Sequence, residues 1–449
     1  MASVNILQQV KTYNRDRQLY GFQNQNCFVS KVCNHKYNDA HRGISKNLGD
    51  TISIALPSGA TSGNGLIVST HPIYQNIAEL PIIGAAYSSI SATDQERIFN
   101  LDKDGFWEQE GRAMAEELGT KVEIEVAKHI TGSATNLDPR SPSYGEMQVN
   151  SGPTRFVDCI STGLLTYQAL AQTQSDWLTM GAPSTKHEVV LPTNYYPPII
   201  GSGLGQFVPR RNDATAQSWE VGTFGTPMTT YHSSNNLPDH IAGALGIAGT
   251  TLTITATNDV TGVNVTELTM SGAGAQTNAV KVGDMGYFLA ASGIRATTFR
   301  GHAKTNQLVQ FRVIESADST GGNVVVKIVT GTYTQGQGLN SSAGHPLQNI
   351  SGPIVLGSTT VKFLPSHKCG LRVAGNMFYL AMPRLTDLSP YQSSIDTDKD
   401  TQVSLRMYHA PIIGQNENLL VNDTIWGALL VPRGSQRICL PLDGNVAAA

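Results

Sequence analysis

The stretch DGFWEQEGRAMAEELGTKVEIEVAKHIT, residues Asp104–Thr131, is the one long, densely charged helical pattern in a chain otherwise composed of short strands and glycine turns. Ten of its residues are charged, whereas the whole chain is 14% charged. At ~1.5 Å per residue the helix would be roughly 42 Å long, longer than one compact domain needs. Apolar residues recur at every fourth position, the spacing of a packing seam: Met114, Leu118, Val122, Val126 and Ile130. The stretch therefore predicts a structural strut rather than the wall of a catalytic cleft.

The chain carries little charge for its length. Of its 449 residues 40% are hydrophobic and 14% charged, against roughly 25% charged in ordinary soluble domains. A weakly charged polar surface suits a subunit that is covered by copies of itself better than a free monomer. An ordinary secreted β-protein is the alternative that composition leaves open.

Basic residues gather near the N-terminus. Residues 1–50 contain seven Lys or Arg and three Asp, an excess that could meet nucleic acid or an acidic partner, or simply remain solvated. The five cysteines are scattered without a CxxC pair, which predicts neither a disulfide framework nor a zinc site. There is no apolar run long enough to cross a membrane and no signal-peptide pattern, so we expect a reducing cytoplasm as the compartment.

Segments with different residue patterns follow one another along the chain. Residues 1–49 read as an extended arm, and residues 50–88 as an extended hairpin loop in which Thr51–Ala55 pairs with Leu66–Val68. Residues 89–153 hold the long helix, 104–131. A second helix is predicted over Thr154–Gly181. The apolar run HEVVL, 187–191, predicts a strand buried on both faces.

Residues 243–353 form a distinct segment. They contain no Trp, no Cys and no helical pattern, but repeated β-branched runs separated by turns, which predict an all-β module of about six strands, a small barrel or a sandwich. Its expected core includes Phe311, Val313, Val324 and Val326, which occupy alternating positions. The flanking segments, 154–242 and 354–449, share a pattern that differs from that of the module. We therefore interpret the module as an insertion into a parent domain.

Motifs for chemistry are weak. Gly201–Gly205 (GSGLG) resembles a phosphate loop, but Gln206 and Pro209 do not open a helix. Asp396, Asp398 and Asp400 alternate as in a calcium loop that lacks its glycine and its final acid, which favours a solvated acidic turn. Glu125 and His129 share a helix face without a second metal-binding pair, which favours a side-chain pair on a solvated helix. We predict no catalytic residues, no metal and no cofactor.

The order of these pieces resembles the major capsid protein of tailed bacteriophages, with the Hong Kong 97 fold: N-terminal arm, extended loop, peripheral domain with a spine helix, and axial domain. Within that family the chain is most similar to the Salmonella podovirus coat-protein group, which carries an inserted β-barrel. The closer match rests on Lys281-Val282-Gly283-Asp284 leading into Tyr287-Phe288, followed by QFRVI (310–314) and VVVKIV (324–329). The resemblance implies an α+β fold with an inserted all-β barrel.

The resemblance also implies a function without catalysis. The subunit would assemble with itself into pentamers and hexamers of an icosahedral shell, in the cytoplasm of a bacterial host. Scaffolding protein, portal and decoration proteins would be its partners, and the virion shell would enclose packaged double-stranded DNA. The competing class is a β-rich tail-fibre or cell-surface carbohydrate-binding protein, which exposed Tyr195 and Tyr196 would favour.

Overall fold

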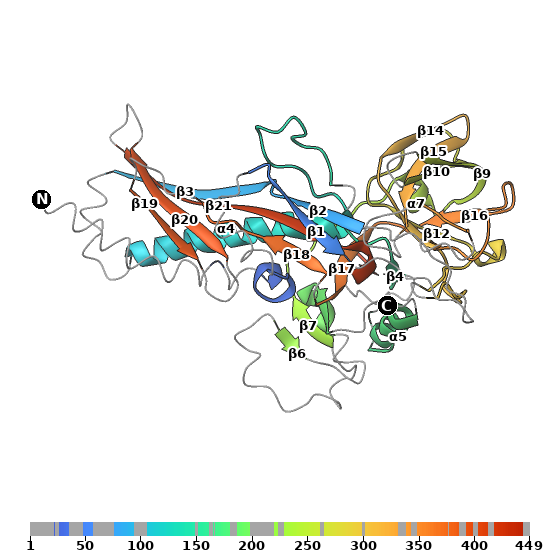
Figure 1. The fold of residues 1–449 in the computed structure, drawn as a ribbon, viewed down its shortest axis with the longest axis horizontal. Coiled ribbons are helices and arrows are strands. Elements are labelled where there is room, and N and C mark those ends of the chain that lie inside the picture. The colour runs from blue at the N-terminus through green and yellow to red at the C-terminus, as the bar shows by residue number, and fades with distance from the viewer. Residues whose placement is uncertain are drawn as a thin grey trace, which may run out of the picture.

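The fold is taken from a computed structural model of the chain. The structure describes residues 22, 27–35, 48–56, 76–93, 106–148, 151–160, 165, 167–179, 186–197, 220–222, 229–260, 265–298, 301–330, 338–342, 348–375, 377–385, 392–397, 403–411 and 417–442. In these residues the molecule is elongated, with a long helix and its sheet at one end and a β-barrel at the other (Figure 1).

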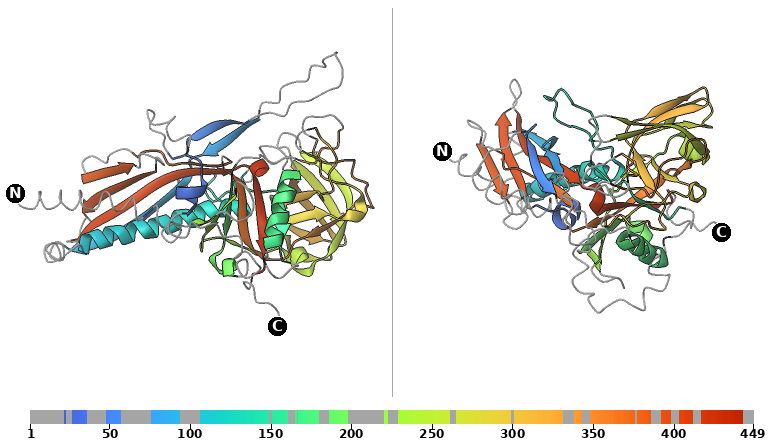
Figure 2. Two further views of the ribbon diagram at one scale, coloured as in Figure 1. Left: turned by 90° about the horizontal axis from the view of Figure 1, so that it is seen from below. Right: turned by 45° about the vertical axis from the view of Figure 1, so that its right-hand side comes forward.

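The long helix, α4 (Phe106–Thr131), lies along a five-stranded antiparallel sheet. The strands of this sheet are β3 (Gly84–Thr93), β18 (Phe378–Ala381), β19 (Gln392–Thr397), β20 (Ser404–Pro411) and β21 (Glu417–Leu430). Figure 2 shows α4 running beside these strands. The prediction of one long helix over this stretch is confirmed, because apolar side chains every fourth residue give α4 a face that packs on the sheet.

A two-stranded hairpin leads into this layer. Strand β1 (Thr51–Leu56) pairs antiparallel with β2 (Asn76–Pro81), and Thr51 is opposite Pro81. The predicted first strand is confirmed. Its partner among the described residues is β2, whereas the predicted partner, Leu66–Val68, lies outside them. The apolar residues Ile52, Ile54 and Leu80 are buried and hold the hairpin against β18 and β21.

A short N-terminal segment is part of the core. Phe28–Val32 forms one π-helical turn, η1, whose Phe28, Val29 and Val32 are buried against α4. Asn34 then makes a parallel bridge to Tyr379 beside β18. The expectation of an extended arm is wrong for this part of residues 1–49, because its closely spaced apolar side chains are buried more favourably in a turn.

The second sheet has seven strands, in the order β4-β22-β17-β5-β7-β6 with β8 also paired to β17. They are β4 (Phe156–Asp158), β5 (His187–Leu191), β6 (Glu220–Gly222), β7 (Thr229–Ser233), β8 (Asp239–His240), β17 (His367–Ala374) and β22 (Ser435–Leu440). Every residue of β5 is buried, as predicted for this run, because β5 lies between β17 and β7. We call this sheet the seven-stranded sheet.

The predicted helix over Thr154–Gly181 is too long at its start. Helix α5 covers Tyr167–Thr179, and the first part of the predicted helix is strand β4 instead. Phe156, Val157 and Asp158 pair in parallel with β22, whose inner position in the sheet offers backbone hydrogen bonds that outweigh helix propensity. The structure of this segment is therefore determined by its pairing with a strand that is distant in the sequence.

The third sheet closes into a barrel. Its strands are β9 (Thr251–Val260), β10 (Val265–Ser271), β11 (Gln276–Val280), β12 (Met285–Phe288), β13 (Gln310–Val313), β14 (Ala317–Thr320), β15 (Asn323–Val329) and β16 (Thr360–Phe363). Six of them form a ring, β10-β9-β16-β12-β13-β15, because β15 also pairs with β10. The barrel, one of the two predicted alternatives, is therefore the observed form.

Two details of the barrel differ from the prediction. The ring needs β16, which pairs with both β9 and β12 and lies beyond the predicted boundary at 353. A short helix, α7 (Ala244–Ala248), precedes β9 where no helix is predicted; its five residues are too few to produce a helical pattern in the sequence. The short 3-10 turns η2 (Thr193–Tyr195), η5 (Ala290–Ser292) and η6 (Pro432–Gly434) complete the described elements.

Candidate functional site

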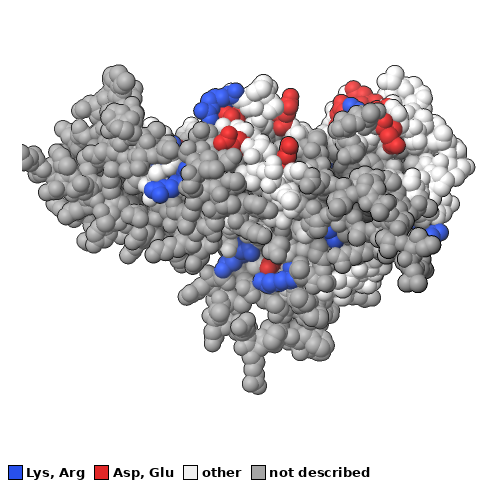
Figure 3. Space-filling model, viewed as in Figure 1, with Lys and Arg blue, Asp and Glu red and all other residues white. Residues whose placement is uncertain are grey.

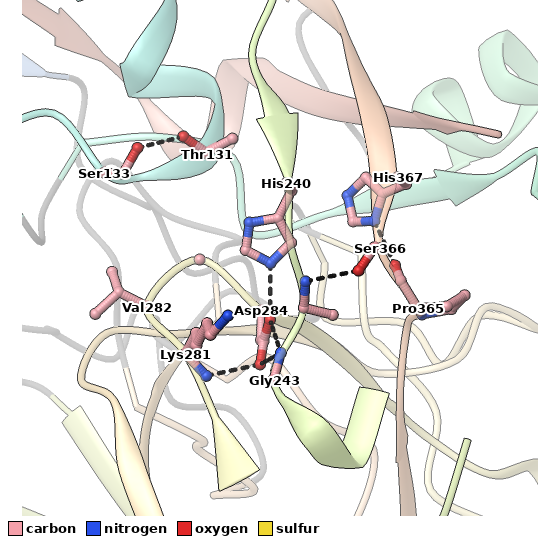
Figure 4. Close-up of polar contacts among 12 residues, drawn as sticks. Thr131, Ser133, His240, Gly243, Lys281, Val282, Asp284, Pro365, Ser366 and His367 are labelled. Carbon is pink, nitrogen blue, oxygen red and sulfur yellow. Dashed lines mark hydrogen bonds and ion pairs between the residues drawn. The ribbon is translucent and has the colours of Figure 1, made fainter. Parts of the chain in front are cut away.

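The barrel, the seven-stranded sheet and the end of α4 meet at a buried polar cluster, which we call the barrel junction. Its centre is the turn Lys281–Asp284 at the start of β12. The Asp284 side chain is fully buried and accepts hydrogen bonds from the backbone N–H of Lys281 (2.8 Å) and of Gly243 (3.1 Å). His240 of β8 donates to it from Nε2 at 2.7 Å (Figure 4). The Asp284 carboxylate thus connects the residues before the first barrel strand, His240 and Gly243, to the turn at Lys281.

Gly283 lets this turn touch the long helix. Its φ is +85°, and a Cβ at this position would lie 2.2 Å from the carbonyl oxygen of Thr131, the last residue of α4. No side chain fits in that space, so the turn and the helix end are in backbone contact. The K-V-G-D motif singled out in the sequence is therefore an element of packing.

Replacing Gly283 with alanine is expected to lower the free energy of unfolding by about 1–3 kcal/mol, since the new Cβ meets backbone in a conformation that disfavours side chains. Urea unfolding followed by circular dichroism measures the change. Gly274→Ala is the matched control: its φ is +65°, but nothing lies within 4 Å of the added Cβ. Equal losses in the two variants would show that the contact with α4 contributes nothing.

Two buried arginines lie at the end of α4, and one of them, Arg437, bonds to it. Arg437 of β22 donates from Nε to the carbonyl oxygen of Ile130 (3.0 Å) and from Nη1 to that of Gly283 (2.8 Å). Arg312 of β13 donates from Nη1 to the carbonyl oxygen of Ser151 (2.7 Å). Burial, and to a smaller extent Arg437, lowers the pKa of Arg312 to about 9. Cations at a helix C-terminus compensate its unsatisfied carbonyls and its dipole.

Three histidines around the junction are kept neutral. Burial lowers the pKa of His129 and of His367 to about 3, with Arg312 acting on the first and Arg437 on the second. Burial also lowers the pKa of His240, against the opposing effect of Asp284. His367 donates from Nδ1 to the carbonyl oxygen of Pro365 at 2.8 Å. These rings act as neutral hydrogen-bonding groups in the core.

The predicted Glu125–His129 pair on a solvated helix face is wrong for His129. Its ring is 3% exposed and lies 2.6 Å from the hydroxyl of Ser151, whereas Glu125 is half-buried and pairs with Lys128 at 2.7 Å. His129 lies three residues after Val126 and seven after Val122 of the seam, so it shares the buried face of α4.

Two glutamines attach the barrel to the rest of the chain. The side-chain amide of Gln310, in β13, donates to the carbonyl oxygen of Phe156 and accepts from its N–H, both at 2.9 Å. Gln307 donates to the Asp176 carboxylate of α5 at 2.7 Å. Gln310 thereby pairs with β4 as a neighbouring strand would, which sets the position of the barrel beside the seven-stranded sheet.

A second buried polar cluster lies on α4 and holds the N-terminal segment. The carboxylate of Glu123 accepts from the Ser234 hydroxyl (2.6 Å) and from the N–H of Cys27 (3.3 Å) at the start of η1. Burial raises the pKa of Glu123 to about 7. Close by, Glu188 of β5 bonds to Nε2 of His232 at 2.6 Å. Glu123 thus connects α4, the N-terminal segment and the loop after β7.

The structural residues selected from the sequence are all buried. In α4 the seam side chains are 0–6% exposed, and those after Met114 share a core with the sheet: Met114, Leu118, Val122, Val126 and Ile130. In the barrel the four selected side chains are 0–1% exposed and share one core: Phe311, Val313, Val324 and Val326. The two sets lie in different cores and form no common site.

Sequence reasoning missed the charged groups of both clusters. Arg312 and Arg437 each stand alone within an apolar strand, in QFRV and RICL, and an isolated arginine in such a run signals burial with carbonyl partners. Glu123 lies three residues before Val126 and therefore on the seam side of α4. The partners themselves come from distant segments and leave no local signal.

The other candidate motifs gain no support as sites. Gly201–Gly205, Asp398 and Asp400 lie outside the described residues, and Asp396 is in strand β19. Tyr195 and Tyr196, expected to be exposed in a carbohydrate-binding protein, are 0% and 6% exposed, and both hydroxyls donate to backbone carbonyls. Within the described ranges no group of His, Cys, Asp or Glu could hold a metal ion. Among the helices described, none has the length and apolarity to cross a membrane.

Comparison with known proteins places the chain beside phage capsids. No protein-family model matches it, and no curated protein matches it. Of the solved structures, 74 chains match. The capsid of Ralstonia phage GP4 is 10% identical with a TM-score of 0.42, covering 92% of this chain and 89% of that one. The capsid of cyanophage P-SCSP1u is 12% identical with a TM-score of 0.37, covering 88% and 84%. The cyanophage Pam1 capsid is 8% identical with a TM-score of 0.37, covering 89% and 87%.

Proposed function

We propose that this chain is a major capsid protein of the Hong Kong 97 type, a structural subunit that assembles into the icosahedral head shell of a tailed bacteriophage. The observation that carries the proposal is α4 lying along β3 and β21 with the β1–β2 hairpin beside this layer, in the chain order that the sequence resemblance requires. Such a long helix–sheet layer gives a flat, elongated subunit, the shape that tiles a thin shell.

The described surface fits a subunit with many copies of itself as neighbours. Large apolar side chains are exposed singly over several elements, including Tyr87, Ile124 and Tyr144, at 41–65%. In Figure 3 acidic side chains gather at the upper edge of the barrel, near β14 and β15. Many weak contacts distributed over a surface suit a lattice, in which each subunit is held by several neighbours at once.

The partners and location that go with the proposal are those of a shell subunit. The chain assembles with itself into pentamers and hexamers, aided by a scaffolding protein and a portal, with decoration proteins as further partners. It lines a head that holds double-stranded DNA without sequence-specific contacts. Assembly takes place in the host cytoplasm, and the virion capsid is its final location. No catalytic group takes part.

We also propose that the barrel is an insertion, as in the Salmonella podovirus group. The chain leaves the seven-stranded sheet after β8 and returns to it in β17, with all barrel strands between. The insertion would therefore run from about residue 243 to β16, further than the sequence boundary at 353. The remaining division is arm 1–49, extended loop 50–88, peripheral domain 89–153 and axial domain 154–242 together with the chain that follows β16.

Expression together with the neighbouring genes, followed by negative-stain microscopy, tests the proposal. Closed shells of uniform size are expected. The control is the same expression without the neighbouring genes, which should yield fewer or irregular shells, because the proposal assigns the scaffold a role in closure. Fibres, or a soluble monomer under both conditions, would contradict it.

The extended loop contains no lysine between Lys46 and Lys103. Shells of this fold that are locked covalently join a lysine of this loop to an asparagine of a neighbour, as the family resemblance implies. We therefore expect a non-covalent shell that dissolves to monomers in denaturing gel electrophoresis. A ladder of covalent multimers from purified particles would refute this.

A further inference from the structure

A small cavity lies between the barrel and the rest of the chain. Its volume is about 30 Å³. Gln307 and Gln310 line it from the barrel side, and Asp176, Trp177 and Gln436 line it from α5 and β22. The direct bonds of Gln307 to Asp176 and of Gln310 to Phe156 border this space, so the cavity belongs to the contact that holds the barrel in place.

The indole Nε1–H of Trp177 and the amide Oε1 of Gln436 belong to the cavity wall and have no hydrogen-bond partner among the described residues. Their residues are 1% and 4% exposed. One is a donor and the other an acceptor, and neither bonds to the other. Leaving such groups unsatisfied in a protein interior is costly, so a third group that bonds to both is favoured here.

We propose that this cavity is a binding site for a single ordered water molecule that joins the barrel to the seven-stranded sheet. A volume of about 30 Å³ is sufficient for a water molecule, which needs about 10–15 Å³. The water accepts from Trp177 Nε1 and donates to Gln436 Oε1, and its second hydrogen is directed to the carboxylate of Asp176. Two to four polar partners are what a buried water requires.

A small anion such as chloride is the rival occupant. Arg155 also lines the cavity, and burial together with the neighbouring Arg433 lowers its pKa to about 10, so positive charge is present. Two observations favour water. Asp176 places a negative carboxylate on the same wall, and the amide oxygen of Gln436 would repel an anion. An occupant that both donates and accepts satisfies all of these groups.

A double-mutant cycle tests the site in the full-length chain. Trp177→Phe and Gln436→Met each remove one partner of the water; Gln436→Met keeps the size of the side chain, whereas Trp177→Phe also removes one ring. Each is expected to lower the urea midpoint by roughly 0.3–1 M, and the double variant to fall no further than the worse single variant, because the water is lost at the first substitution. Leu178→Ala, on the 47% exposed neighbour of Trp177, is the control and should leave the midpoint unchanged.

Independent shifts that add in the double variant would overturn the proposal, as would a higher midpoint for Gln436→Met, which is the result expected for a dry cavity. A density map of the unaltered protein better than about 2 Å gives a second readout that does not depend on the variants folding. One peak within hydrogen-bond distance of Trp177 Nε1 and Gln436 Oε1 is expected. An anomalous bromide signal there after exchange of the salt would assign an anion instead, and an empty cavity would also refute the site.

Discussion

Replacing Phe311 with alanine is expected to lower the free energy of unfolding by about 3–5 kcal/mol. The ring is fully buried and makes edge contacts with Phe288 and Phe363, each at 5.8 Å between ring centroids. Opposite it stands Gly286, where a Cβ would lie 2.4 Å from the ring. Because the facing residue has no side chain that could refill the space, the cavity cannot collapse, and the loss should fall at the upper end of the range.

Urea unfolding monitored by far-UV circular dichroism measures this loss, and we expect aggregation or temperature-sensitive assembly of the variant in cells. Val325→Ala is the matched control, because Val325 is a 46% exposed outward residue of β15 in the same barrel and should change stability by less than about 0.5 kcal/mol. A loss below 1 kcal/mol for Phe311→Ala would mean that the barrel core is not packed around this ring.

Acidification is expected to destabilise the subunit through its buried histidines. The pKa of His129 and of His367 is lowered to about 3 in the fold, so both rings are neutral there while the unfolded chain takes up protons below pH ~6.5. The stabilisation that comes from the neutral rings is therefore fully present above pH ~6.5. It is lost as the pH falls towards 3, by about 1.4 kcal/mol per pH unit for each ring. Together the two histidines would lower the free energy of unfolding by about 7 kcal/mol between pH 8 and pH 4.

Titration of Glu123 changes the stability of the fold in the opposite direction. Its pKa is raised to about 7, so the folded chain holds a proton that the unfolded chain releases, and stability falls as the pH rises from ~4.5 to ~7. Acidification across that window raises the free energy of unfolding by about 3 kcal/mol. This is less than the amount by which the two histidines lower it. The net effect between pH 8 and pH 4 is a fall of about 3 kcal/mol in the free energy of unfolding from these three groups.

Thermal and urea unfolding at several pH values checks both signs with two variants. His367→Asn retains a donor near Nδ1 for Pro365 and should flatten the acid loss. Glu123→Gln removes the opposing titration and should steepen it. The His129 ring faces Arg312, and His367 faces Arg437 and His240, so no carboxylate is a leading cause of either shift. An unchanged pH profile in both variants would show that neither group titrates as described.

The sequence predicted those elements whose side-chain pattern repeats. Helix α4 and strand β5 follow from apolar spacing alone, and the barrel follows from its β-branched runs. The extent of α5 could not be predicted, because the segment before it pairs with a strand far along the chain. The pairing of β4 with β22, for example, joins Val157 to Ile438, and nothing in the local sequence of Phe156–Asp158 reports it.

The barrel junction was predictable to a smaller degree. Lys281–Asp284 stood out as a motif, but its role as an acceptor for Gly243 and His240 depends on a fold that brings together α4, β8 and β22. Buried charges such as Arg437 follow a local rule, an isolated charge in an apolar strand, whereas the carbonyl oxygens that satisfy them come from Ile130 and Gly283. Tertiary contacts, rather than propensity, determine this site.

Closure of the barrel has a consequence for the proposed shell, in which many copies would lie close together. An open sheet offers unpaired backbone groups to which a strand of another copy can bind, which is a route to aggregation. In the ring each of the six strands has a neighbour on both sides, and α7 lies against β11 at the end of the flap formed with β14. Crowded copies can therefore lie side by side without exchanging strands through their barrels.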